Sequence, residues 1–131
     1  MFKIEKGQSM SDKLKVLVVD DEDALRMLLK DELTLHGFDV SDAENGMVAI
    51  DKLNKDHFDL VVLDIKMPEM DGIEVLRNIR EQNLSKKVIM LTGVDELKVA
   101  RESMNLGAND FITKPYDFQK LFACIDRVLK E

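Results

Sequence analysis

The chain has 131 residues, with 19 lysines and arginines against 26 aspartates and glutamates, which gives a formal net charge of −7. This surplus of negative charge repels nucleic acid and anionic membranes, so we expect no direct binding to either. Hydrophobic residues make up 45% of the chain, enough for a core at this length, and the single cysteine excludes an internal disulfide. The longest apolar runs, such as Leu60–Leu63, are far too short to span a bilayer, and we see no secretory signal. These features predict one cytoplasmic domain.

From Leu14 onward, short apolar runs alternate with amphipathic stretches, and we expect residues 1–13 to form a flexible leader. Three of the runs are continuous, as in parallel strands buried on both faces, whereas the second alternates like an edge strand. The expected strands are Val16–Val19, Phe38–Val40 with its neighbours, Leu60–Leu63, Val88–Leu91 and Phe111–Ile112. Apolar residues at helical spacing predict helices around Leu25–Leu33, Gly46–Lys55, Ile73–Ile79, Leu97–Met104 and Phe118–Leu129.

Five strands that alternate with five helices predict an α/β fold, in which right-handed crossovers cover both faces of a parallel sheet. In such sheets, ligands bind beyond the carboxyl ends of the strands. Asp20 and Asp21 follow the first expected strand and Asp64 follows the third. Thr92 follows the fourth strand and Lys114 follows the fifth. We therefore expect three carboxylates, a hydroxyl and an amine to converge on a single pocket.

Such a pocket suits a hard cation and a phosphoryl group. Carboxylates close together need a counter-charge, and Mg²⁺ prefers their oxygen atoms as ligands. The hydroxyl of Thr92 and the ammonium of Lys114 complement the charge spread over a transferring phosphoryl group. Asp64 is the better nucleophile for an aspartyl phosphate, because it is the lone acid at the end of a wholly apolar strand. The adjacent Asp20 and Asp21 are better placed to share the metal.

Each of these residues, taken alone, has an ordinary structural explanation. Adjacent aspartates after a strand commonly cap a helix, and a lone lysine is usually a solvated side chain with a packed stem. Only their joint placement at the strand ends favours a functional site.

Four segments resemble the receiver domain of two-component response regulators, in particular chemotaxis regulators. These segments are Val18–Glu22, Asp64–Gly72, Leu91–Gly93 and Gly107–Pro115. The four segments occur in the same order as in the family, and the stretches between them are long enough to hold a helix. The resemblance extends over residues 14–131. It implies a flavodoxin-like fold, a doubly wound five-stranded parallel sheet with strand order 2-1-3-4-5 and five helices.

The resemblance also implies a phosphorylation-controlled signalling switch. Asp64 would accept a phosphoryl group from the phosphohistidine of a sensor histidine kinase or a histidine phosphotransfer protein, in a Mg²⁺-dependent reaction. Lys114 would pair with the phosphoryl oxygens, and Thr92 would donate a hydrogen bond to one of them. Asp20 would act mainly through a metal-bound water. Asp21 and Asp64 would bind the metal directly, with the backbone carbonyl of Lys66 as the third protein ligand, so that the metal site comprises Asp20, Asp21, Asp64 and Lys66.

On phosphorylation, Thr92 and the switch aromatic Phe111 would turn inward. This movement would alter the surface formed by the fourth helix, the fifth strand and the fifth helix. That surface would bind a downstream protein or output domain, or a second copy of the chain in a homodimer. Lys114–Pro115 is a candidate for the cis peptide that the family often has there. Val94, beside the path of the attacking water in family members, is apolar. We therefore expect slow self-dephosphorylation and not the activity of a classical enzyme.

Three other functions remain open. A phosphohydrolase with an aspartyl nucleophile would carry a second aspartate two residues after Asp64, where this chain has Lys66. A flavin-binding electron carrier of the same fold would need a phosphate loop of small residues where this chain has Asp20–Glu22. A receiver-like scaffold that is never phosphorylated would not require the intact set of acids, hydroxyl and lysine. The sequence names neither kinase nor output, and it suits both a stand-alone regulator and a fragment of a longer one.

Overall fold

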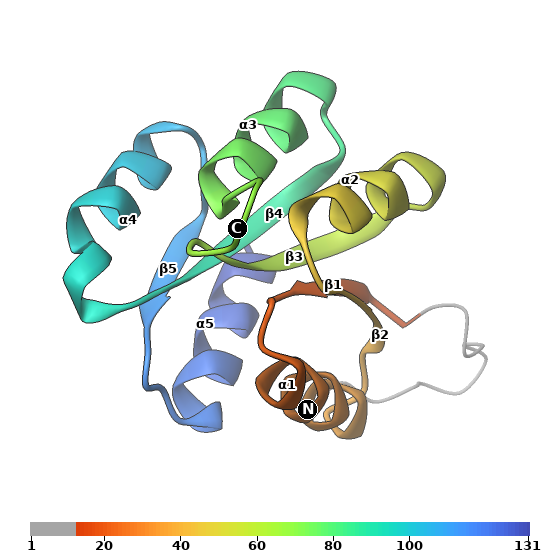
Figure 1. The fold of residues 1–131 in the computed structure, drawn as a ribbon. Coiled ribbons are helices and arrows are strands. Elements are labelled where there is room, and N and C mark those ends of the chain that lie inside the picture. Colours follow the sequence, from red (N-terminus) through yellow and green to blue (C-terminus); the bar gives the residue numbers. More distant parts are fainter. Residues whose placement is uncertain (1–12) are drawn as a thin grey trace.

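The computed structural model describes residues 13–131, which form a parallel sheet between two layers of helices (Figure 1). The strands are β1 (Lys15–Val19), β2 (Asp39–Ala43), β3 (Phe58–Asp64), β4 (Ser85–Thr92) and β5 (Asp110–Thr113). The helices are α1 (Asp23–Leu35), α2 (Gly46–Lys55), α3 (Gly72–Gln82), α4 (Leu97–Asn105) and α5 (Phe118–Leu129), with a 3₁₀ turn η2 (Val94–Glu96) before α4. The strand order is β2-β1-β3-β4-β5 and all neighbouring pairs are parallel. The predicted flavodoxin-like fold is confirmed.

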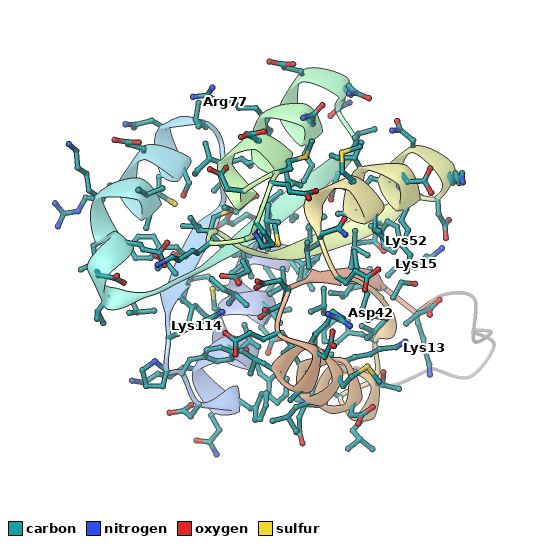
Figure 2. The ribbon with its side chains drawn as sticks, in the orientation of Figure 1. Lys13, Lys15, Asp42, Lys52, Arg77 and Lys114 are labelled. Atoms are coloured by element: carbon teal, nitrogen blue, oxygen red, sulfur yellow. The ribbon has the colours of Figure 1, made fainter. Side chains whose placement is uncertain are left out.

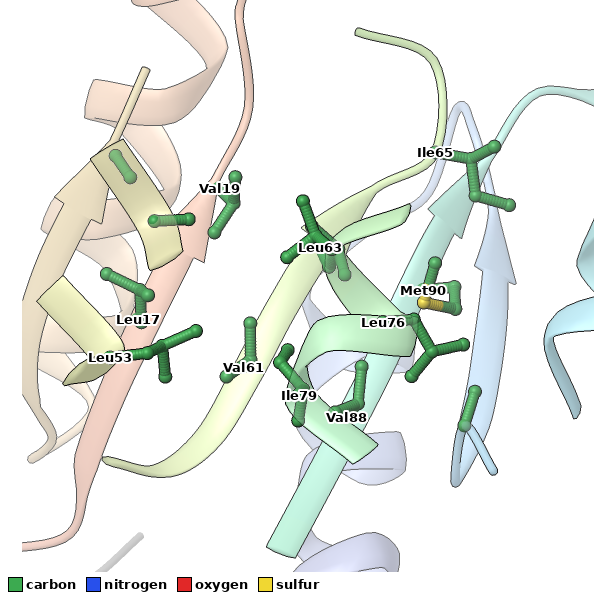
Figure 3. Packing of buried hydrophobic residues seen from close by; sticks show 14 of the residues in the cluster. Leu17, Val19, Leu53, Val61, Leu63, Ile65, Leu76, Ile79, Val88 and Met90 are labelled. Atoms are coloured by element: carbon green, nitrogen blue, oxygen red, sulfur yellow. The ribbon is translucent and has the colours of Figure 1, made fainter. Parts of the chain in front are cut away.

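The sheet is buried on both faces. Helices α2, α3 and α4 cover one face, and α1 and α5 cover the other (Figure 1). Residues Val16–Val19 of β1 are all 0% exposed, and alternate members belong to the two opposite cores. Figure 3 shows the first core, in which Val61 of β3 and Val88 of β4 pack near Leu76 and Ile79 of α3. Burial of both faces accounts for the continuous apolar runs of the central strands.

Side-chain caps begin two of the helices that follow the site-bearing ends of the strands. At the start of α3, Asp71 accepts a hydrogen bond from the backbone N–H of Glu74 at 3.0 Å. At the start of α5, Asp117 accepts one from the backbone N–H of Lys120 at 2.7 Å. Each cap satisfies a helix N–H that has no partner within the helix, so the chain can leave the sheet edge abruptly.

Two details differ from the sequence prediction. Strand β2 spans Asp39–Ala43, so Phe38 precedes the strand and lies in the core with 2% of its surface exposed. Leu28 belongs to the predicted apolar stripe but is 48% exposed, whereas Leu29 and Leu33 are fully buried. The apolar stripe of α1 is wider than the face that packs on the sheet.

The predicted leader lies almost wholly outside the described residues, because residues 1–12 are not among them. Its flexibility stays a prediction. Between residues 13 and 131, the structure contains no helix with the length and apolar character that a membrane crossing needs.

Gly72 provides a test of how the site-bearing end of β3 is built. A Cβ at this position would lie 2.3 Å from the backbone oxygen of Asp64 and 2.7 Å from Cα of Ile65. Those are backbone atoms, so the end of β3 would have to move. We expect Gly72→Ala to lower the free energy of unfolding by about 1–3 kcal/mol, measured by urea denaturation.

Gly93→Ala is the matched control. A Cβ there would meet only the ends of two flexible side chains, 2.8 Å from Oδ1 of Asp95 and 3.0 Å from Oε1 of Glu96. Both carboxylates can rotate away, so this variant should lose clearly less stability. Equal losses in the two variants would contradict the tight packing inferred at Gly72.

Candidate phosphoryl and metal site

Three carboxylates meet at the carboxyl edge of the sheet. Asp20 and Asp21 follow β1, and Asp64 ends the adjacent strand β3. One carboxylate oxygen from each of the three lies within 4.8 Å of the others. Asp20 is 0% exposed and Asp64 is 4% exposed, whereas Asp21 is exposed. The pairing of β1 with β3 brings together residues that are more than forty positions apart in the sequence.

Lys114 reaches the same cluster from the end of β5 (Figure 2). Its Nζ lies 3.2 Å from Oδ1 of Asp64 and 3.5 Å from Oδ2 of Asp20. The backbone N–H of Lys114 donates to the carbonyl of Thr92 at 2.7 Å, which anchors the lysine beside the end of β4. The peptide bond between Lys114 and Pro115 is cis, as the sequence suggested.

The burial of this cluster and the charges within it shift the pKa values of Asp64 and Lys114. Burial raises the pKa of Asp64 to about 6, Lys114 opposes the rise, and the charge of Asp20 adds to it. Burial lowers the pKa of Lys114, but the carboxylates of Asp64 and Asp20 outweigh that effect and leave this pKa raised. Oδ2 of Asp20 is buried and accepts no hydrogen bond in the described structure, although Nζ of Lys114 forms an ion pair with it at 3.5 Å.

These features fit a divalent cation with hard oxygen ligands. One ammonium faces three carboxylates, so the cluster keeps excess negative charge. A buried carboxylate oxygen without a hydrogen bond is a site where a ligand bond offsets the cost of desolvation. Mg²⁺ takes one or two carboxylates and retains several waters, which suits a cluster with one exposed member.

Thr92 and Phe111 make contacts of their own, separate from those of the carboxylate cluster. Thr92 is 0% exposed, and its hydroxyl donates to the backbone oxygens of Gly93 at 3.2 Å and Glu96 at 3.4 Å. Phe111 is half-buried and packs against the core under α4, opposite Met90 in the sheet register. The hydroxyl of Thr92 is thus committed to η2 and not to the carboxylates.

A hollow opens above the cluster. Lys66 is exposed on its rim, at the second position after Asp64. The residues that line it are Asp21, Glu22, Asp64, Lys66, Gly93, Glu96 and Lys114. Glu22, Gly93 and Glu96 were not among the residues that the sequence singled out for the site. Nothing in their spacing marks them, because they reach the hollow through loops whose shape depends on the sheet.

The sequence analysis also missed Arg26, which supports the site from α1. Arg26 is only 8% exposed, and its Nη1 donates to the backbone oxygen of Asp20 at 2.9 Å. Its Nε donates to Asp42 of β2 at 2.8 Å, and its Nη2 donates to Asp23 at 2.8 Å. These bonds tie the loop after β1 to β2 (Figure 2, Asp42). One feature of the sequence could have indicated this role of Arg26. It lies three residues before Leu29, so helical spacing places its side chain on the buried side of the predicted helix.

Comparison with known proteins identifies this arrangement. The family model of the response regulator receiver domain matches residues 16–126. The chain belongs to this family. The receiver domain is 37% identical over 116 residues to chemotaxis protein CheY of Bacillus subtilis (strain 168), a match that covers 88% of this chain and 97% of CheY. It is a phosphorylation switch of two-component signalling and not a classical enzyme.

Some of the relatives are longer than the chain. The regulatory protein AtoC of Escherichia coli (strain K12) is 38% identical over 116 residues, which is 88% of this chain but 25% of AtoC. The chain therefore spans a quarter of that relative. Among solved structures, a CheY-like receiver domain protein from Methanospirillum hungatei JF-1 superposes with a TM-score of 0.86 at 31% identity, covering 91% of this chain and 95% of that one. Chemotaxis protein CheY4 of Vibrio cholerae superposes with a TM-score of 0.83 at 31% identity, covering 88% and 98%.

The raised pKa of Asp64 predicts that stability without divalent cations depends on pH. The folded chain holds the Asp64 proton up to about pH 6, whereas the unfolded chain releases it near 3.8, so stability falls as the pH rises through this window. We expect Asp64→Asn to raise the free energy of unfolding by about 1–3 kcal/mol at pH 7. The gain should nearly vanish at pH 4. Urea denaturation with EDTA at both pH values measures it.

Asp31→Asn is the control for this experiment, because it removes the same charge from an exposed position on α1. Its effect should be small at both pH values. If Asp64→Asn stabilises the chain no more than Asp31→Asn at pH 7, the carboxylate of Asp64 is not the strained group that its burial indicates.

Proposed function

We propose that Asp64 is the phosphoacceptor of this receiver domain, and that it takes the phosphoryl group from a phosphohistidine on a histidine kinase or a histidine phosphotransfer protein. The observation that carries the proposal is the placement of its carboxylate. Asp64 is buried at the end of β3, 3.2 Å from the ammonium of Lys114 and within 4.8 Å of oxygens from Asp20 and Asp21. Asp20 is also buried beside Lys114, at 3.5 Å, but Asp64 lines the hollow above the cluster and Asp20 does not.

Asp21, Asp64 and the backbone carbonyl of Lys66 would hold Mg²⁺, with Asp20 acting through a metal-bound water. When bound, the cation supplies the positive charge that lets three carboxylates ionise together and that offsets the charge of the phosphoryl group. Asp20 and Asp64 remain paired with Lys114 on the other side of the cluster. The exposed Asp21 keeps the metal side of the hollow open to solvent.

In the transfer step, a carboxylate oxygen of Asp64 attacks the phosphorus atom of the phosphohistidine. A P–O bond forms and the P–N bond breaks, and its electron pair returns to the imidazole ring of the donor. The product is an acyl phosphate on Asp64. Lys114 then pairs with the phosphoryl oxygens, which is a short move because its Nζ already lies 3.2 Å from Asp64. Burial of Asp64 keeps bulk water away from the reacting atoms.

The switch would act through Thr92 and Phe111. To donate a hydrogen bond to the phosphoryl group, Thr92 has to release the backbone oxygens of Gly93 and Glu96. The turn η2, which directly precedes α4 in the chain, would then change position. Phe111, which is already half-buried against the core under α4, would then turn further inward.

The readout surface would be that of α4, β5 and α5. It would bind a downstream protein or output domain, or a second copy in a homodimer. Two apolar residues of α4 support a protein partner there, since Leu97 is 40% exposed and Met104 is 38% exposed. We place this switch in the cytoplasm, with protein partners and not with nucleic acid, in line with the net charge of −7. Val94 is 68% exposed and apolar, so it cannot orient a water molecule, and the acyl phosphate should be lost slowly.

The metal should bind more tightly as the pH rises from 5 to 7. Asp64 has to lose its proton to act as a ligand, and its pKa is about 6. The fall in Kd for Mg²⁺ should be about tenfold over this range. Titration calorimetry at both pH values measures it. Asp64→Asn should weaken binding and flatten the pH dependence, whereas Asp31→Asn should behave as the parent does.

Phosphorylation is tested by intact mass after incubation with acetyl phosphate, with Mg²⁺ or with EDTA. We expect one added phosphoryl group in Mg²⁺ only, and its loss on treatment with hydroxylamine, which cleaves acyl phosphates. Asp64→Asn should gain none, and Asp59→Asn should gain as much as the parent. A folded parent that binds Mg²⁺ and gains no mass would instead support a scaffold that is never phosphorylated.

A further inference from the structure

Glu96 places a fourth acidic side chain at the hollow where Asp64 would be phosphorylated. It lines this hollow together with Asp21, Asp64 and Lys114. Its Oε1 accepts a hydrogen bond from the backbone N–H of Gly93 at 3.0 Å. Among the side chains that the structure describes, no lysine, arginine or histidine forms an ion pair with it. The carboxylate is therefore held in position by one neutral donor.

The main chain of Glu96 also holds Thr92. The hydroxyl of Thr92 donates to the backbone oxygens of Glu96 at 3.4 Å and Gly93 at 3.2 Å. The backbone N–H of Glu96 donates in turn to the carbonyl of Gly93 at 3.0 Å. The hydroxyl of Thr92, which is shared between the oxygens of Gly93 and Glu96, and the amide of Gly93 are thus both engaged within this segment. The segment from Thr92 to Glu96 forms a closed loop of hydrogen bonds.

We propose that Glu96 is an internal competitor of the phosphoryl group, a residue that holds the segment from Thr92 to Glu96 in its unphosphorylated arrangement. This inference rests on the proposed phosphorylation of Asp64. A phosphoryl group brings nearly two negative charges into the hollow, and the carboxylate of Glu96, which lines the same hollow, repels them. Thr92 has to leave the backbone oxygen of Glu96 to donate to that group. Charge and hydrogen bonding both oppose phosphorylation.

The positive charge available at the site is small, so the negative charge of Glu96 has a large effect on a phosphoryl group there. Within 4 Å, Lys114 is the single cation that faces the carboxylates of Asp20 and Asp64 in the described site. Lys66 is exposed on the rim of the hollow. Removal of the charge of Glu96 therefore leaves a larger share of the positive potential for the phosphoryl group. Loss of its acceptor atom also frees Gly93 and loosens η2.

The variant Glu96→Gln tests the effect of the charge of Glu96 without removing its hydrogen bond to Gly93, so it distinguishes a charge effect from a general loss of structure. Gln keeps an oxygen that can accept from Gly93 and loses only the charge. With acetyl phosphate in saturating Mg²⁺, we expect its initial rate of phosphorylation to exceed that of the parent by about threefold to tenfold. Glu96→Ala, which also loses the acceptor, should be at least as fast. Beryllofluoride, a phosphoryl mimic, should bind both variants more tightly than the parent in a ¹⁹F NMR titration.

Asp95→Asn is the matched control, because Asp95 lies in the same turn, carries the same charge and is exposed outside the hollow. It should phosphorylate at the parent's rate. Thermal unfolding of all variants checks that they are folded. A parent that is phosphorylated while Glu96→Gln is no faster than Asp95→Asn would overturn the inference. So would weaker Mg²⁺ binding by Glu96→Gln together with a slower rate, since Glu96 would then assist the metal. A parent that accepts no phosphoryl group would instead refute the proposed function.

Discussion

The ammonium of Lys114, held between the carboxylates of Asp64 and Asp20, is the interaction on which the site depends. Asp20 follows β1 and Asp64 ends the adjacent strand β3, but β4 separates β3 from β5, which Lys114 follows. Neighbouring strands are about 4.8 Å apart, so the side chains of Lys114 and Asp64 together have to bridge two strand spacings. The length of the lysine side chain makes this contact possible, and β4, the strand in between, ends at Thr92 with the small residue Gly93 directly after it. The spacing of the strands and the size of these side chains together define the hollow.

The same arrangement makes the site responsive to charge. Burial raises the pKa of Asp64 to about 6, because a carboxylate without solvent is costly and one lysine offsets only part of that cost. A site with such an uncompensated buried carboxylate is stabilised by any ligand that adds positive charge or redistributes the negative charge. The polar residues around it connect directly to the backbone. Arg26 bonds to the main chain of Asp20, and Thr92 bonds to η2, so a change of charge at the carboxylates can move the chain around them.

Much of this was available from the sequence, and the limits follow from physical causes. The continuous apolar run of β3 is typical of a strand buried on both faces, so a strand ending in Asp64 could be predicted from the order of the residues alone. The extent of β2 could not, because an edge strand with alternating polarity has no apolar run to mark its ends. The apolar stripe of α1 predicted the helix but not that Leu28 would stay 48% exposed. Which part of a wide stripe is covered depends on the angle at which the helix meets the sheet.

The sequence by itself determined the five strands, the order of the chemistry along them and the family, since strand ends and turn residues are local features that a pattern carries. Only the tertiary structure decided which donors and acceptors pair. It placed Lys114 at 3.2 Å from Asp64, buried Arg26 against the main chain of Asp20, and turned the hydroxyl of Thr92 toward Glu96. These contacts join residues on different elements or within irregular turns, where distance along the chain says little about distance in space. They arise from the packing of helices on a twisted sheet, which no local pattern encodes.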